Sequence, residues 1–319
     1  MQPLSDNLRF DSSHLAVKNS ETSSDTCPAC RSRKRADLGA KNGHDVFRCS
    51  DCKTLYTETQ SSVETQFYDD YYHAGNLSVP SFIHDRVKEI VASFAEYRQT
   101  NRLLDLGCGA GVIMEAAAAA GWKVSGLEIS QTAVDHLRQF GYDVFKGELV
   151  EAHYSTGTFD VVVASELLEH IPAPRTFVKE ISRILRSGGL LWATTPNGAG
   201  VSWRLLGTRW SVVSPPEHLQ LFTRRGIKFL LSEAGFRRVD IATHGVNPVE
   251  ISHTFRSTKS INSDSNGQTY SGDDRVCSSY KLNAKLTKNA AGRLVKYSVN
   301  GLLSLTGLGD SLKIHALKS

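Results

Sequence analysis

Apolar runs of four to six residues alternate with longer stretches of helical periodicity through most of the chain. The runs predict strands and the stretches predict helices, because buried parallel strands are almost continuously apolar while the helices that cover them repeat every 3.6 residues. The expected strands are 102–106, 123–128, 142–145, 159–164, 190–194 and 237–242, and the expected helices are 79–97, 112–120, 131–140, 176–185 and 224–234. Such alternation predicts a doubly wound α/β fold with a ligand at the carboxyl ends of its parallel strands.

The segments that flank this pattern have a different character. Residues 1–26 are polar without a sustained period and are predicted to form a disordered tail. Residues 251–279 are rich in Ser, Asn, Thr, Asp and Gly and are predicted to be a mobile insertion. Apolar residues between 294 and 305 follow a helical period. We expect this segment to pack against the core, a lid or a second copy in a homodimer. An interfacial membrane helix is the less favoured alternative, because positive charge is sparse.

A glycine-rich turn follows the predicted strand 102–106. Gly107, Gly109 and Gly111 have no Cβ, so the backbone can approach a ligand closely, and the helix that follows directs its free N–H groups and positive dipole end at an anionic group. Glu128 lies 21 positions after Gly107 and closes the next strand, where a carboxylate can accept hydrogen bonds from both ribose hydroxyls. Together the two features predict a nucleoside site.

The G-x-G-x-G spacing differs from the G-x-G-x-x-G of dinucleotide-binding folds and resembles that of class I S-adenosylmethionine-dependent methyltransferases. The resemblance continues in order through 159–170, 185–189, 195–197 and 215–219, and it covers about 81–236. It implies a Rossmann-like, mostly parallel seven-stranded sheet into which the last strand, 309–318, returns antiparallel. It also implies that the cofactor is S-adenosyl-L-methionine, whose carboxylate is the anion at the glycine loop.

The same resemblance implies which residues bind the cofactor. They are Asp105, Gly107 and Gly109 beside the methionine moiety, with Gly111 completing the loop; Glu128 at the ribose; Ile129 flanking the adenine; Glu148 and Leu149 at the adenine edge; and Ser165 over the cleft. Many relatives have Asp where Glu148 stands.

Acceptor chemistry is expected where the chain leaves the strand 159–164. Glu166 and His170 are four residues apart, so on a helix they would share a face, and the carboxylate could orient the imidazole as a general base for a hydroxyl acceptor. His218, which follows Pro-Pro-Glu, is a second candidate base. The alternative for both is a hydrogen-bonded structural histidine, since a carboxylate acceptor needs no base.

Two C-x-x-C pairs precede the main pattern, with 18 residues between them. Cys27 and Cys30 form the first pair, and Cys49 and Cys52 form the second, an arrangement typical of a zinc ribbon. Four thiolates leave no open coordination position, so the Zn²⁺ is expected to be structural. A module spanning 27–58 is too small to fold on its core alone and needs the metal. Four unconnected cysteines or a redox pair are the alternatives, but a thioredoxin-type motif requires a βαβ context.

Residues 59–80 are read as a linker with an aromatic patch at 67–73, which either closes over the cofactor or packs as a hinge before the methyltransferase domain, 81–319.

The composition, with 40% apolar and 22% charged residues, is that of a soluble globular protein. No apolar run reaches the ~18 residues of a membrane span and no signal peptide is recognisable, so a cytoplasmic protein is expected.

We interpret the sequence as an S-adenosylmethionine-dependent methyltransferase that acts on a small-molecule or glycan-type acceptor, most simply at oxygen. The net charge of +4 is too small by itself to imply a nucleic-acid partner. A basic cluster at 31–35 nevertheless leaves an RNA-directed methyltransferase, anchored by the ribbon, as an alternative. A non-catalytic scaffold, which would bind the cofactor without turnover, is the third interpretation.

Overall fold

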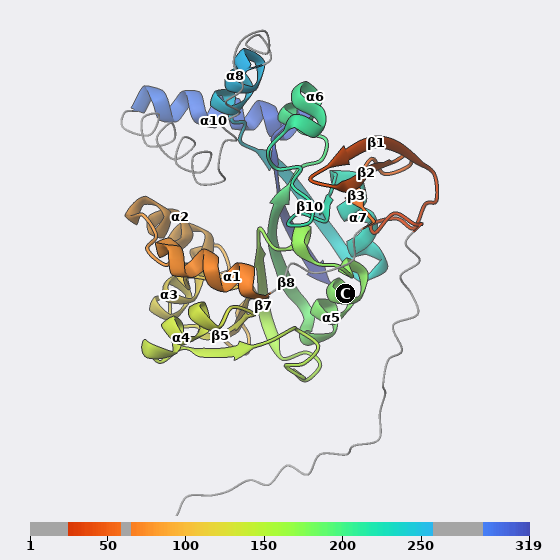
Figure 1. The fold of residues 1–319 in the computed structure, drawn as a ribbon. Helices are drawn as coiled ribbons and strands as arrows, with labels where there is room; N and C mark the ends of the chain where they lie inside the picture. Colours follow the sequence, from red (N-terminus) through yellow and green to blue (C-terminus); the bar gives the residue numbers. More distant parts are fainter. Residues whose placement is uncertain (1–24, 59–64, 258–289) are drawn as a thin grey trace, which may run out of the picture.

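The computed structural model describes residues 25–58, 65–257 and 290–319. The strands of these residues form two sheets, one of seven strands in the order β10-β11-β8-β7-β4-β5-β6 and one of four in the order β1-β2-β3-β9. Figure 1 shows the larger sheet running through the middle of the molecule and the smaller one to one side, with its first strands in red.

The larger sheet has the predicted topology. Its strands are β4 (Arg102–Leu106), β5 (Lys123–Glu128), β6 (Asp143–Lys146), β7 (Phe159–Ser165), β8 (Leu185–Pro196), β10 (Phe236–His244) and β11 (Ser311–Lys318). Neighbouring strands from β6 to β8 are parallel, whereas β11 is antiparallel to both β8 and β10. The prediction of a doubly wound, mostly parallel sheet with an antiparallel last strand is therefore confirmed.

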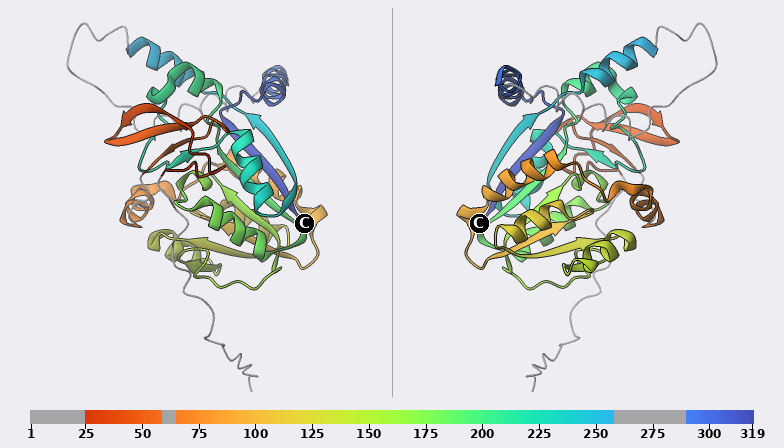
Figure 2. Two further views of the ribbon diagram at one scale, coloured as in Figure 1. Left: turned by 90° about the vertical axis from the view of Figure 1, so that its right-hand side faces the viewer. Right: turned by 90° about the vertical axis from the view of Figure 1, so that its left-hand side faces the viewer.

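Helices cover both faces of this sheet, which Figure 2 shows from opposite sides. α2 (Ser81–Ala92) and α3 (Val112–Ala119) pack on the face that carries Val161 and Val163. α5 (Pro174–Ile184) and α7 (Arg224–Glu233) pack on the face that carries Val162 and Ala164. Because successive side chains of a strand point to opposite faces, the apolar strand β7 supplies both halves of the core.

The remaining elements lie around the sheet. They are α1 (Thr65–Tyr71), the π-helix η1 (Tyr72–Asn76), α4 (Gln131–Gln139), α6 (Val201–Leu206), α8 (Pro248–Ser257) and α10 (Ala290–Thr306), with the short 3₁₀ helices η2 (Ala95–Tyr97), η3 (Leu168–His170) and η4 (Gly207–Arg209). In the part of the chain that the structure describes, no helix combines the length and the apolar character needed to cross a bilayer.

Several predicted boundaries differ from those observed. The predicted helix 79–97 is replaced by α2, which ends at Ala92, and by the separate turn η2. The predicted strand 190–194 is the middle of the longer strand β8. The predicted insertion 251–279 begins inside α8, and its remainder lies outside the described residues, as does nearly all of the predicted tail 1–26.

The cysteine-bearing segment folds onto the main domain through a shared sheet. β1 (Arg35–Lys41), β2 (His44–Cys49) and β3 (Leu55–Thr57) form an antiparallel meander. β3 then pairs with β9 (Gln220–Leu221), a two-residue strand from the segment between β8 and α7. The sequence pattern did not predict β9, because two residues carry no period and the strand exists only through this long-range pairing.

Side chains reinforce the junction. The hydroxyl of Thr223, which caps α7, donates to the carbonyl of Cys52 over 2.6 Å, and Nη1 of Arg175 donates to the carbonyl of Ala29 over 2.8 Å. Gly226 on α7 faces the ribbon so closely that a Cβ there would lie 2.3 Å from Oγ1 of Thr54. The buried cysteines accordingly belong to the same apolar cluster as the side chains of α5 and α7.

Candidate active site

The glycine loop joins β4 to α3 at the carboxyl edge of the larger sheet. Gly109 has φ of +49°, and a Cβ there would lie 2.5 Å from the hydroxyl oxygen of Tyr72. Gly111 has φ of +78°, and its missing Cβ would lie 2.2 Å from Cδ2 of Leu137 on α4. Glycine is therefore required at both positions, at 109 for the approach of Tyr72 and at 111 for helix packing.

Glu128 ties this loop to the loop that follows β5. One carboxylate oxygen accepts from the backbone N–H of Gly109 over 3.0 Å. The other accepts from the N–H groups of Ile129 and Ser130 over 2.8 and 3.0 Å. The side chain is only 5% exposed, so its negative charge is held in one position between the two loops that are expected to bracket the nucleoside.

Asp105 places a second carboxyl group beside Glu128. Burial, together with the charge of Glu128, raises the pKa of Asp105 to about 8. Two neighbouring carboxyl groups in a low-dielectric site favour a cationic ligand, because a positive charge stabilises the ionised form of both. The ammonium and sulfonium groups of S-adenosyl-L-methionine fit this environment.

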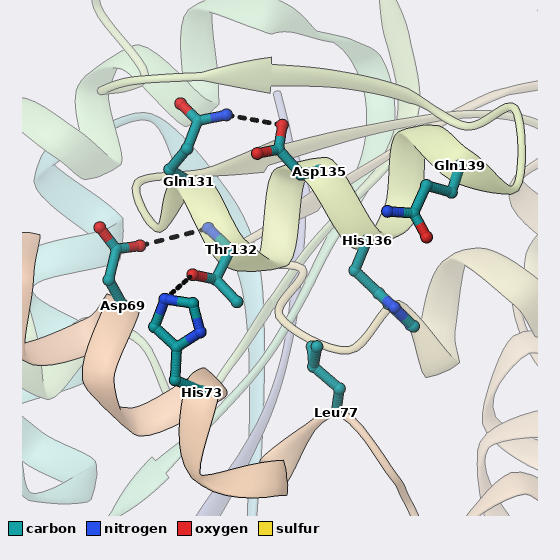
Figure 3. A pocket seen from close by; sticks show the side chains of 8 residues that line it. All are labelled: Asp69, His73, Leu77, Gln131, Thr132, Asp135, His136 and Gln139. Carbon is teal, nitrogen blue, oxygen red and sulfur yellow. Dashed lines mark hydrogen bonds between the residues drawn. The ribbon is translucent and has the colours of Figure 1, made fainter.

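The aromatic segment at 67–73 reaches the glycine loop through Tyr72, which lies against Gly109. Closure of the segment over the cofactor stays a prediction. The charge of Glu128 acts on both Tyr68 and Tyr72, and burial is the main cause that raises the pKa of each phenol. Figure 3 shows two contacts between this segment and Thr132 at the start of α4. The carboxylate of Asp69 accepts from the backbone N–H of Thr132, and Nε2 of His73 lies 3.0 Å from the hydroxyl oxygen of Thr132. α1 and η1 are thus held against the start of α4.

Two further predicted cofactor residues lie in the loop after β6. Leu149 is 2% exposed and belongs to the apolar core, whereas the side chain of Glu148 is exposed. The backbone N–H of Gly147 donates to the carbonyl of Glu128 over 3.0 Å, so this loop adjoins the predicted ribose site. Ser165 lies at the end of β7, and its hydroxyl contacts that of Thr194 over 3.1 Å.

The two predicted histidines meet on the other side of Tyr68. The ring centroids of His170 and His218 are 4.7 Å apart, and those of Tyr68 and His170 are 6.4 Å apart. Nδ1 of His170 lies 2.8 Å from the carbonyl oxygen of Glu217, and Nδ1 of His218 lies 2.7 Å from that of Val212. A carbonyl only accepts, so each Nδ1 carries a hydrogen, and in the neutral form of the ring the lone pair is on Nε2. Burial lowers the pKa of His170, which favours the neutral ring.

The helix on which Glu166 and His170 would share a face does not form. Glu166 has φ of +49°, in the left-handed region, and only the short turn η3 follows it. The carboxylate that adjoins His170 is that of Glu169, whose Oε1 lies 3.9 Å from Nε2 of His170. Sequence reasoning missed Glu169, for which the one available signal was its place next to a candidate histidine.

The four predicted metal-binding cysteines converge in the ribbon. The Sγ atoms of Cys27 and Cys52 lie 3.5 Å apart, as do those of Cys30 and Cys49. All four Sγ atoms lie within 4.8 Å of one another. A tetrahedral ion with Zn–S bonds of about 2.3 Å separates its ligands by roughly 3.8 Å, so the donor atoms and their spacing fit zinc.

We predict one structural zinc ion per chain in this cluster. Metal analysis of protein purified without chelator should give a zinc content near one, and the double variant Cys49→Ser with Cys52→Ser should reduce it to near zero and lower the melting temperature. Cys108→Ala, which removes a buried thiol outside the cluster, should leave the zinc content unchanged. Absence of zinc from the parent protein would contradict the assignment of a zinc ion to the four cysteines.

We also predict that Glu128→Ala weakens binding of S-adenosylhomocysteine by about 1 to 3 kcal/mol, because the ribose loses a charged hydrogen-bond acceptor. Calorimetry measures the affinity, and thermal unfolding without ligand reports any loosening of the glycine loop. Asp143→Ala removes an exposed carboxylate from the adjacent strand and serves as the matched control. Equal affinity in the Glu128 variant and the parent would place the ribose elsewhere.

Comparison with known proteins agrees with this geometry. A protein-family model described as a methyltransferase domain matches residues 79–241. A ubiquinone biosynthesis O-methyltransferase of Thiobacillus denitrificans is 30% identical over 174 residues, which are 50% of this chain and 75% of the relative. Relatives of the same name from Aromatoleum aromaticum and Escherichia coli are 34% and 36% identical, and the matches span 44% and 45% of their lengths.

Solved structures were also compared. A methyltransferase from Archaeoglobus fulgidus, described as dependent on S-adenosylmethionine, is 18% identical with a TM-score of 0.48, over 74% of this chain and 94% of its own. A phosphoethanolamine N-methyltransferase of Haemonchus contortus is 18% identical with a TM-score of 0.47, over 73% of this chain and 52% of its own. With the family match, the seven-stranded sheet and the glycine loop facing Glu128, the chain belongs to the class I S-adenosylmethionine-dependent methyltransferases.

Proposed function

We propose that the chain transfers the methyl group of S-adenosyl-L-methionine to an oxygen of a small-molecule acceptor. The observation that carries this proposal is the pair of adjacent imidazoles, His170 and His218, beside Tyr68, the phenol on which the charge of Glu128 also acts. A basic nitrogen at this place suits an acceptor that must lose a proton. The relatives named ubiquinone biosynthesis O-methyltransferases support oxygen as the methylated atom.

The protein's part in this reaction is to align and shield the reactants. The sulfonium of the cofactor supplies an electrophilic methyl group, which transfers by in-line displacement. Asp105 and the glycine loop orient the methionine moiety, Glu128 holds the ribose, and the side chains of Ile129 and Leu149 enclose the adenine. Tyr68 and Tyr72 exclude water from the cleft, which strengthens every electrostatic interaction within it.

The acceptor oxygen is then expected against the Nε2 atoms of the two histidines. A hydroxyl is a poor nucleophile until its proton leaves, and a positioned base contributes about 10²- to 10⁴-fold to the rate. The carbonyl groups of Glu217 and Val212 hold the two rings in the tautomer that accepts a proton at Nε2. Ser165, at the end of β7, and Glu166, just after it, are expected beside the acceptor.

An RNA acceptor is the weaker candidate. One face of the ribbon is used in packing on α7 and in pairing with β9, which leaves less of it for a nucleic acid. Within the basic cluster at 31–35, Arg35 pairs with Glu58 over 2.6 Å and stacks 3.9 Å from the ring centroid of Phe47. The positive charge of Arg35 is therefore paired within the ribbon.

The proposal is tested by incubating the purified protein with cofactor that carries an isotopically labelled methyl group and with separate small-molecule and RNA fractions of a cell extract. We expect label in an O-methyl group of a compound from the small-molecule fraction, identified by mass spectrometry. Label confined to the RNA fraction would overturn the proposal in favour of the alternative acceptor. Cofactor binding without labelling of either fraction would indicate a scaffold.

With an acceptor in hand, His170→Ala and His218→Ala should each lower kcat by about 10²- to 10⁴-fold, or roughly 3 to 5 kcal/mol in the barrier. The affinity for S-adenosylhomocysteine should hardly change, because neither ring is expected to touch the cofactor. His136→Ala, on α4 in the pocket lined by Asp69, His73 and Leu77 (Figure 3), is the control and should retain parental kcat. If affinity falls together with turnover in either variant, that histidine is structural.

The raised pKa of Asp105 predicts that cofactor affinity depends on pH. With a pKa of about 8 in the free protein, Asp105 is mostly protonated at pH 7, whereas the ammonium of the ligand favours the ionised form. Binding should therefore release a proton, and the affinity should rise with pH up to about 8, by at most about tenfold per unit. Calorimetry of S-adenosylhomocysteine in two buffers of different ionisation enthalpy measures the proton release. Asp105→Asn should abolish it, and no release by the parent protein would contradict the placement of the ammonium.

A further inference from the structure

A cavity of about 480 Å³ opens at the edge of the seven-stranded sheet. The edge strand on this side is β10, whereas the glycine loop follows β4 in the interior of the sheet. The polar side chains that line the cavity come from α7, β10, α10 and β11 and are Arg224, Asp240, Ser304, Lys313 and His315. The cavity therefore lies apart from the residues assigned to the cofactor and the acceptor.

From this cavity we propose that the protein binds a phosphate monoester at the edge of β10, with its phosphate group between Arg224 and Lys313. The site would be a second ligand site, and it does not depend on the proposed function.

The cations of the cavity come from different elements of the fold. Lys313 stands opposite Ala242 in the register of β11 with β10, so both side chains lie on one face of the sheet. The small side chain of Ala242 leaves room for the longer one of Lys313 at the edge. Arg224 begins α7, and a Cβ at Gly307 would lie 3.1 Å from its Nη1. The guanidinium group is thereby placed next to the end of α10.

Little negative charge balances these cations. Within the described ranges, the side chains of Arg224 and Lys313 form no hydrogen bond or ion pair. Lys313 is half-buried, and burial together with the charge of Arg86 lowers its pKa. Asp240 lines the cavity too, but Oδ2 of its carboxylate accepts from Nε of Arg238 over 2.9 Å. An anion bound between Arg224 and Lys313 would relieve this imbalance, because a partly buried charge is stable only when it is paired.

The donors of the cavity indicate the class of anion. A guanidinium group presents a planar fork that bonds to two phosphate oxygens, and an ammonium group neutralises a phosphate as a point charge. The hydroxyl of Ser304 can donate a further hydrogen bond. A phosphate monoester carries about 1.5 to 2 negative charges at pH 7, which matches two cations better than the single charge of a carboxylate does.

The size of the cavity favours an ester over a free phosphate ion. Its volume of about 480 Å³ lies within the roughly 300 to 1,000 Å³ of ordinary ligand pockets, so an organic group has room beside the phosphate. A soluble ester and the headgroup of phosphatidic acid both offer this chemistry. Leu302 and Leu305, which are exposed on α10 on either side of Ser304, would contact the lipid in the second case.

Calorimetry with glycerol 3-phosphate tests the site without any need for turnover. The full-length protein is first saturated with S-adenosylhomocysteine, which keeps the anion out of the glycine loop. We expect one molecule to bind per chain, and we expect Arg224→Ala and Lys313→Met each to weaken binding at least about tenfold. Arg225→Ala, which removes the next, exposed arginine of α7, is the matched control and should bind as the parent does.

Sedimentation with phosphatidylcholine vesicles, prepared with and without phosphatidic acid, distinguishes the two sources of the phosphate. Sedimentation that requires phosphatidic acid and is lost in Lys313→Met would assign the site to a lipid headgroup. Binding of glycerol 3-phosphate without sedimentation would assign it to a soluble ester. The inference is overturned if the parent binds neither probe, or if both variants, shown to be folded by circular dichroism, bind the probes as tightly as the parent.

Discussion

Backbone pairing between β3 and β9 joins the cysteine-bearing sheet to the domain that binds the cofactor, and the acceptor side of the cleft depends on it. Leu219, just before β9, accepts through its carbonyl from the N–H of Thr57 over 3.0 Å and donates its own N–H to the carbonyl of Glu169 over 2.8 Å. The amide of Gln220 donates to the carbonyls of Leu168 and Ile171. A continuous set of hydrogen bonds therefore runs from the ribbon to the turn that carries Glu169 and His170.

This arrangement gives the cysteine cluster a role in shaping the site. A metal that fixes the two cysteine pairs would also fix β3, because Cys49 ends β2 and Cys52 lies in the turn between β2 and β3. The folding free energy of such a module is largely the free energy of metal binding. β3 in turn holds the segment with His218. The ribbon is thus part of the wall around the proposed acceptor, although none of its cysteines is expected to touch a reactant.

Charge is distributed differently on the two sides of Tyr68. On the cofactor side, burial and the charge of Glu128 raise the pKa of Asp105, so a positively charged ligand would stabilise the ionised form of Asp105. On the acceptor side, burial raises the pKa of Glu169 well above its usual range, and its carboxylate is oriented by the hydroxyl of Thr195.

The fold could be predicted from the sequence because apolar residues repeat with clear periods in its strands and helices. The glycine loop could be predicted because its positive φ angles favour glycine. The positions of Glu128 and the four cysteines could be predicted for the same reason, since short spacings determine them. Glu169 and β9 could not, because their roles arise from contacts between segments about 50 to 170 residues apart, which leave no local period. The proposed helix through Glu166 failed because that residue adopts a left-handed conformation at the end of β7, where the chain turns abruptly into η3.

The dependence of the acceptor side on the ribbon is tested most directly by hydrogen exchange of backbone amides before and after removal of the metal from the cysteine cluster. We expect faster exchange at Leu219 and in the turn η3, whose carbonyls accept from Leu219 and Gln220 beside the β3–β9 junction, together with unchanged exchange in β4 and the glycine loop. Unchanged protection of Leu219 and η3 after metal removal would contradict the account, since the ribbon would then be an independent module that leaves the site intact.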